Sequence, residues 1–317
     1  MSTGAELAGR LREGDLTAAP AVLNLLETNA PSARAQAGEL LAAVSPASLG
    51  REAPGHVVGV TGPPGVGKSS LLSRLVAHWR SDERSVAVLA VDPTSRRSGG
   101  ALLGDRARIE VDPSDRSVFI RSTAAGNRLG GLAPATRAAA AALAAAFDVV
   151  VIETVGVGQS ETEVADVADT VAVVVQPASG DVLQFLKAGI MEIPDVLVVT
   201  KSDLGRIATR AVSDLRAALR ALGADTEVVA VSALPPGAGV ADLVAALDRH
   251  RESIDLPARR TAARRLHALA DFAAEHGERG LRAVGGRRTA ERWLAQQDAA
   301  LDVRALTSEL ERRAASA

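Results

Sequence analysis

The chain has 317 residues, enough for one large α/β domain with helical extensions. Its formal net charge of −2 at pH 7 gives no electrostatic reason to expect nucleic acid or an anionic membrane as a partner, and the lack of cysteine excludes disulfides, zinc–thiolate sites and cysteine nucleophiles. We expect a cytoplasmic protein, because no apolar stretch reaches the roughly 18 residues of a membrane span and no signal peptide is visible.

Leucine residues recur at helical spacing through the first part of the chain and predict an N-terminal helical extension over residues 1–50. We expect a break in these helices around residues 29–32 and a turn-rich linker at residues 46–54. From residue 57 the pattern changes to continuous runs of valine and isoleucine, which are typical of strands buried on both faces of a sheet. We predict strands at residues 57–61, 86–91, 117–120, 148–153, 171–175, 196–200 and 227–231.

Alanine- and leucine-rich segments between these strands predict helices. Strands that alternate with helices form right-handed crossovers and a mostly parallel sheet. The predicted fold class is therefore α/β, with a roughly seven-stranded sheet flanked by helices in a domain of residues 51–255. We expect its helices at residues 69–81, 133–146, 160–168, 181–192, 208–222 and 239–251.

The last part of the chain, residues 256–317, is predicted to be an arginine-rich helical arm that could serve dimerisation. The stretch at 277–288, GERGLRAVGGRR, could be a basic surface for a partner, but its glycines and charges favour a solvated connection. We expect helices at residues 257–276, 288–298 and 302–315.

A phosphate-binding loop is encoded directly after the first predicted strand. It matches the pattern G-x-x-x-x-G-K-[ST] and opens a predicted helix, which is the context that this motif requires. Glycines let successive backbone N–H groups point at a phosphate, and the helix N-terminus favours the same anion. Lys68 would bridge phosphate oxygens, while Ser69 would supply a hydroxyl ligand to Mg²⁺. The predicted phosphate-binding residues are Gly62, Pro63, Pro64, Gly65, Val66, Gly67, Lys68, Ser69, Ser70 and, near the γ-phosphate, Gly156.

Three carboxylates are candidates to bind the metal ion or to orient the water that attacks in hydrolysis. Glu153 ends a predicted strand beside the phosphate loop and has the position of the Walker B carboxylate that holds Mg²⁺. Asp92 also ends a strand, where parallel sheets line a ligand crevice, and would ligate the metal or orient the attacking water. Asp105 lies in a glycine-containing loop that could close over the nucleotide. Together with Lys68 these residues form the predicted catalytic set, and together with Ser69 the predicted metal ligands.

Two motifs after later strands predict guanine as the base. The first, TKSD, resembles N-K-x-D with threonine in place of asparagine. Its aspartate can accept hydrogen bonds from N1–H and the amino group of guanine, whereas adenine would leave the carboxylate unpaired. The second, SAL, follows the next strand and would offer a backbone N–H to the guanine carbonyl. The predicted guanine-binding residues are Thr200, Lys201, Asp203, Ser232, Ala233 and Leu234.

From about Leu7 to Ser232 the chain resembles the MeaB/ArgK (MMAA-like) family of P-loop GTPases. The resemblance rests on long segments that include GVTGPPGVGKSS, AVDPTSRRSGGALLGDRARI, ETVGVGQSETEVAD and PASGDVLQFLKAGIMEIPD. It implies GTP or GDP and Mg²⁺ as cofactors, a homodimer, and a chaperone function for an adenosylcobalamin-dependent acyl-CoA mutase of the methylmalonyl-CoA mutase type. It also implies that Asp92, Asp105 and Glu153 are metal and switch residues.

The resemblance implies a further switch loop at residues 177–190 that communicates the nucleotide state to the mutase. Asp181, Gln184 and Lys187 are spaced to share one helix face within it. Only three of the 36 basic residues are lysines, and the other two, Lys68 and Lys201, lie in nucleotide-binding motifs. We therefore expect this face to contact the partner, although an ordinary solvated face is the simpler alternative. Arginine side chains that could act on the phosphates in cis are Arg96, Arg97 and Arg108.

Two other functions share the predicted fold. A metallochaperone GTPase of the nickel-insertion type usually carries cysteine- or histidine-rich metal sites, but this chain has no cysteine and its five histidines are scattered. A kinase linked to basic amino-acid transport is the other alternative, and no residue pattern marks an amino-acid pocket.

Overall fold

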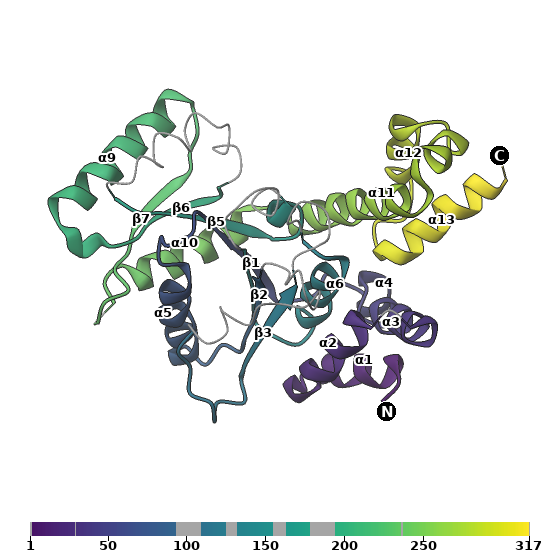
Figure 1. Ribbon diagram of the computed structural model, residues 1–317, viewed down its shortest axis with the longest axis horizontal. Helices are drawn as coiled ribbons and strands as arrows, with labels where there is room; N and C mark the ends of the chain where they lie inside the picture. The colour runs from purple at the N-terminus through teal and green to yellow at the C-terminus, as the bar shows by residue number, and fades with distance from the viewer. Residues whose placement is uncertain are drawn as a thin grey trace, which may run out of the picture. The chain divides into compact units, whose positions relative to one another are not determined.

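The computed structural model describes residues 2–28, 30–92, 109–124, 132–154, 163–177, 194–235 and 237–316 (Figure 1). By their contacts these residues form two compact units, one of Gly55–Ile254 and one that joins Met1–Pro54 to Asp255–Ala317. The division into residues 1–50, 51–255 and 256–317 stays a prediction. Within the described ranges, no helix is long and apolar enough to cross a membrane.

The larger unit contains a seven-stranded parallel sheet, which confirms the predicted α/β fold class. The strand order is β3-β2-β4-β1-β5-β6-β7. The central strands are buried along their whole length, as their valine-rich sequences predict. The strands are β1 (His56–Thr61), β2 (Val86–Asp92), β3 (Val118–Ala124), β4 (Val149–Glu153), β5 (Thr170–Val175), β6 (Val196–Val199) and β7 (Glu227–Ala230).

Helices cover both faces of this sheet (Figure 1). On one side α5 (Lys68–Ser81) and α10 (Val240–Ser253) share a core with alternate strand residues such as Val58 and Val60. On the other side lie α6 (Pro134–Leu143) and the 3₁₀ turn η3 (Val164–Asp166). Gly59 faces this turn so closely that a Cβ atom there would lie 2.6 Å from Val164 Cγ2. A further helix, α9 (Arg206–Ala221), packs on β6 and β7.

Two of the predicted helices are not seen as full helices in the described residues. The described part of the helix expected at residues 160–168 consists mainly of the short η3 turn, because the chain must re-enter the sheet at Thr170. The helix expected at residues 181–192 lies outside the described residues.

A polar network lies at the amino-terminal ends of the strands, around the buried residues His56 and Thr170. His56 Nε2 lies 2.8 Å from Thr170 Oγ1, which in turn lies 2.9 Å from His250 Nδ1. His250 continues the network to Asp195, at 3.1 Å, and His56 Nδ1 lies 3.8 Å from Asp248. Because burial disfavours the charged imidazolium, the pKa of His56 is lowered from its usual value, although Asp248 opposes this shift.

The smaller unit is helical and is assembled from both ends of the chain. Arg264 forms a bidentate ion pair with Glu52, with N–O distances of 2.7 and 3.0 Å. The guanidinium of Arg304 donates to the carbonyl oxygen of Arg34 at 2.5 Å. These contacts explain why the terminal segments fold together. The helices are α1 (Gly4–Arg12), η1 (Leu16–Ala18), α2 (Ala19–Glu27), α3 (Pro31–Ala43), α4 (Pro46–Leu49), α11 (Leu256–Ala283), α12 (Arg287–Leu294) and α13 (Val303–Ala315).

One prediction for these segments holds in part, and one is wrong. The expected linker at residues 46–54 begins with the four-residue helix α4 and continues as bends and loop over residues 50–54. The helix expected at residues 257–276 is interrupted at Gly277, as predicted, but the stretch at 277–288 is not a solvated connection, because a second helical segment of α11 runs on to Ala283. Leu281 and Val284 of this stretch are buried in a core with side chains of α13, which glycine and arginine content alone could not reveal.

Burial of His56 predicts a pH-dependent stability of the larger unit. The unfolded chain binds a proton at His56 below about pH 6.5, whereas the folded chain resists it, so the free energy of unfolding should fall as the pH falls from about 7.5 to about 5.5. A His56→Gln exchange should flatten this dependence. Urea unfolding in a Trp293→Phe background measures it, because the buried Trp79 of α5 is then the sole tryptophan.

The exposed side of α5 supplies a control for this experiment. His78 is partly exposed beside Asp82, so His78→Gln should keep the pH dependence of the parent. An identical pH dependence in His56→Gln and the parent would contradict the assignment.

Candidate nucleotide-binding site

The loop between β1 and α5 has a backbone that requires glycine. Gly62, Gly65 and Gly67 adopt φ angles of 139°, 78° and 97°, in the region that side chains rarely tolerate. Gly62 also packs against β5, where a Cβ atom would lie 2.1 Å from the Val174 carbonyl oxygen. Helix α5 begins at Lys68 and its N-cap is Gly67, which has no side chain to occupy the first N–H groups. These groups are suited to bind an anion.

Lys68 folds back over this loop. Its side chain is largely buried, and Nζ donates to the carbonyl oxygens of Gly62 at 2.6 Å and Pro63 at 3.1 Å. The ammonium group is therefore held above the loop, where phosphate oxygens bound by the loop amides would meet a positive charge.

The predicted metal ligands gather where β2 and β4 end. Glu153 is the last residue of β4, and its register partners are Val60 of β1 and Ala90 of β2. Asp92 ends β2 two residues further on, and both carboxylates are almost fully buried. The Ser69 hydroxyl donates to Glu153 Oε1 at 3.1 Å. A serine hydroxyl and two buried carboxylates are hard oxygen donors, which fits a Mg²⁺ ion.

The predicted guanine motifs meet at the ends of β6 and β7. The hydroxyl of Ser232 donates to Asp203 Oδ1 at 2.7 Å and accepts the Leu234 N–H at 3.2 Å. Asp203 and Lys201 are exposed at this edge, and Lys201 adopts a left-handed φ of 55°. The structure thus brings the two motifs together with the carboxylate held in place.

Several contacts that hold the site together are not evident from the motifs. The hydroxyl of Thr200 lies 2.7 Å from the Val66 carbonyl oxygen, so it ties the base motif to the phosphate loop. The substitution of threonine for asparagine therefore keeps a bracing hydrogen bond. Arg74 of α5 donates to the Ala233 carbonyl at 2.8 Å, and Lys201 Nζ contacts Gln176, which directly follows β5. The position of Gln176 at a strand end is the one signal that could have indicated it.

Eight residues of the predicted site and its surroundings lie outside the described residues. They are Asp105, Gly156, Asp181, Gln184, Lys187, Arg96, Arg97 and Arg108.

Comparisons with known proteins agree with this geometry. The chain matches the family described as methylmalonyl Co-A mutase-associated GTPase MeaB over residues 19–279. A putative GTPase of Pyrococcus abyssi is 44% identical over 199 residues, which cover 62% of this chain and 59% of the relative. A probable GTPase of Mycobacterium tuberculosis is 41% identical over 260 residues, which cover 78% of this chain and 74% of the relative.

A solved structure shares the fold. The crystal structure of a LAO/AO transport system kinase matches with a TM-score of 0.59 and 29% identity, over 92% of this chain and 96% of that chain. The match to the Pyrococcus protein spans about three fifths of that relative's length. The family match and the Mycobacterium relative together confirm the resemblance seen in the sequence: the chain belongs to the MeaB family of methylmalonyl-CoA mutase-associated GTPases.

Proposed function

We propose that the protein binds GTP with Mg²⁺, hydrolyses it, and uses the resulting conformational change to serve an adenosylcobalamin-dependent acyl-CoA mutase. The observation that carries the proposal is the arrangement of two groups of residues at the carboxyl ends of the parallel strands. Lys68, Ser69 and the carboxylate of Glu153 lie at the ends of β1 and β4. The carboxylate of Asp203, which accepts a hydrogen bond from Ser232, lies at the ends of β6 and β7. This arrangement matches the phosphate and base ends of one guanine nucleotide.

Hydrolysis at such a site depends on positioning and on neutralising charge more than on covalent chemistry. Lys68 and the loop N–H groups would hold the phosphates, and Ser69, Glu153 and Asp92 would hold Mg²⁺, which supplies further positive charge. Asp92 is alternatively placed to orient the attacking water. We propose that Asp105 and Gly156 complete the site, with Arg96, Arg97 and Arg108 as candidate arginines in cis. We expect intrinsic turnover to be slow and the partner to accelerate it.

Base selection is assigned to Asp203. A carboxylate has about four acceptor positions, so the bond from Ser232 leaves capacity for the two donors of a guanine edge. Adenine presents no equivalent donor pair and would desolvate the charge without compensation.

The partner is inferred from the family. Its description names a methylmalonyl-CoA mutase-associated GTPase, and we propose a mutase of that class as the partner, with the chaperone gating cobalamin delivery or protecting the bound cofactor. We also propose that the protein acts in the cytoplasm as a homodimer, and that Asp181, Gln184 and Lys187 contact the mutase.

The kinase alternative is retained because the related crystal structure is that of a protein named as a transport system kinase. The two functions differ in the phosphate acceptor. Incubation with γ-labelled GTP should release inorganic phosphate, whereas label on a protein or amino acid would favour the kinase.

Removal of the Lys68 ammonium should abolish nucleotide binding. Without it the β- and γ-phosphates lose a buried, charge-assisted contact. Calorimetric titration of Lys68→Ala with GDP and GTP should show no measurable binding, and unchanged affinity would end the proposal.

A milder change tests the brace between base motif and phosphate loop. Thr200→Val keeps the side-chain shape but removes the donor to the Val66 carbonyl, which should weaken GDP binding about tenfold. Thr209→Val on α9 is the matched control, because that hydroxyl bonds only locally to the Gly205 carbonyl at 3.2 Å. Equal affinities for both variants would argue against the brace.

The partner proposal is tested with purified components. The protein and a methylmalonyl-CoA mutase from the same source are mixed with GDP or with a non-hydrolysable GTP analogue and separated by size. We expect a complex whose amount depends on the nucleotide, and loss of that dependence in Lys68→Ala. Absence of a complex with either nucleotide would contradict the partner while leaving the GTPase proposal intact.

A further inference from the structure

Three potential metal ligands meet between helices α11 and α13, in the helical unit and outside the nucleotide site. Glu275 and His276 come from α11 and Glu311 comes from α13. One ligand atom of each lies within 4.8 Å of the others, and His276 Nε2 lies 3.3 Å from Glu311 Oε1. We call these residues the α11–α13 cluster. One imidazole nitrogen and two carboxylate oxygens are a donor set that zinc and similar divalent metals accept.

The imidazole of His276 is packed against other residues of α11. Its ring centroid lies 4.8 Å from that of Phe272, which is fully buried in the core between α11 and α13. On the next turn, Gly280 comes so close that a Cβ atom there would lie 2.3 Å from His276 Cβ. A packed histidine loses less conformational freedom on binding a metal than a mobile one would.

The backbone adds a second attraction for a cation. Gly277 has φ 57° and ψ −159°, so the helix that starts at Leu256 is interrupted directly after His276. The negative end of that helix dipole therefore lies at the cluster, where it adds to the charge of two carboxylates. A divalent cation would be attracted both by the two carboxylates and by the negative end of the helix dipole.

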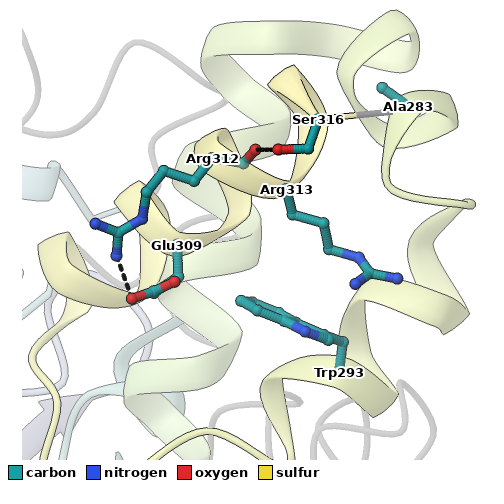
Figure 2. A pocket seen from close by; sticks show the side chains of 6 residues that line it. All are labelled: Ala283, Trp293, Glu309, Arg312, Arg313 and Ser316. Carbon is teal, nitrogen blue, oxygen red and sulfur yellow. Dashed lines mark hydrogen bonds and ion pairs between the residues drawn. The ribbon is translucent and has the colours of Figure 1, made fainter.

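A second surface that includes α13 carries arginine side chains instead of a group of metal ligands (Figure 2). A cleft of about 560 Å³ there is lined by Trp293 and by two arginines. Arg312 pairs with Glu309, and the guanidinium of Arg313 lies 5.6 Å from the Trp293 ring centroid. Each arginine thus has a contact outside the cluster, and Glu309 is paired with Arg312, so we take Glu311 as the α13 carboxylate that serves a cation.

We infer that the α11–α13 cluster binds a divalent transition-metal ion, with zinc as the probe, and that the ion fastens α13 to α11. Three protein ligands at a half-exposed position leave room for water in the remaining coordination position. The imidazole disfavours Mg²⁺ and Ca²⁺, which prefer oxygen ligands.

Calorimetric titration of the whole protein with zinc sulfate tests the inference. Magnesium in large excess would compete for the proposed hard-oxygen site near Ser69, and the cluster variants assign the remaining zinc binding. We expect one zinc ion per chain, and we expect His276→Gln and Glu311→Gln each to lower the association constant at least about tenfold. His78→Gln is the matched control, because that histidine has a single carboxylate neighbour, Asp82 at 3.8 Å, and should leave binding unchanged.

A second measurement separates metal binding from a simple ion pair of His276 with Glu311. Zinc should raise the melting temperature of the parent and of His78→Gln, but not that of the two cluster variants. Absence of zinc binding by the parent overturns the inference, as does unchanged affinity in both cluster variants. A loss in only one of the two variants overturns the three-ligand arrangement.

Discussion

The nucleotide site depends on one close contact between a loop and a strand. Gly62 lies against the Val174 carbonyl so tightly that a Cβ atom would be 2.1 Å from the oxygen. This contact fixes the start of the phosphate loop beside β5, and the loop then leads into α5 at Lys68. The positions of the lysine ammonium and of the Ser69 hydroxyl follow from it. A larger residue at 62 would displace the loop and both side chains together.

The sheet carries its polar groups at both ends for different reasons. At the carboxyl ends, Glu153 and Asp92 are buried carboxyl groups whose oxygen atoms suit a divalent cation. At the amino ends, His56 and Thr170 are hydrogen-bonded within the protein, and burial keeps the histidine pKa low. The first group adjoins the phosphate loop, and the second lies at the opposite ends of the strands. Burial alone does not distinguish a binding site from a structural one.

The sequence was sufficient for features that depend on local pattern. Unbroken valine runs indicate strands covered on both faces, and the structure confirms these strands. The motif that ends in Lys68 and Ser69 carries its own structural context, and it lies between β1 and α5 as predicted. The positions of Glu153 and Asp92 followed from the rule that ligands bind at the carboxyl ends of parallel strands.

Features that depend on contacts between distant segments could not be predicted in this way. The pairing of Glu52 with Arg264 joins residues more than two hundred positions apart, and no local pattern marks it. Thr200 stands where the guanine motif has asparagine, and the motif alone does not show that its hydroxyl donates to the Val66 carbonyl oxygen. The stretch after Gly277 has the composition of a loop, but Leu281 and Val284 bury it against α13. The α11–α13 cluster likewise depends on the packing of two helices.

The central claim is that one sheet edge binds the phosphates of a nucleotide at Lys68 and selects its base at Asp203. The most direct measurement compares the affinities of GTP and ATP, with and without Mg²⁺, for the protein and for Asp203→Asn, with Asp214→Asn on the exposed face of α9 as the control. The account predicts Mg²⁺-dependent binding that strongly favours GTP, retained in Asp214→Asn and largely lost in Asp203→Asn. Equal affinity of the unaltered protein for GTP and ATP would contradict it.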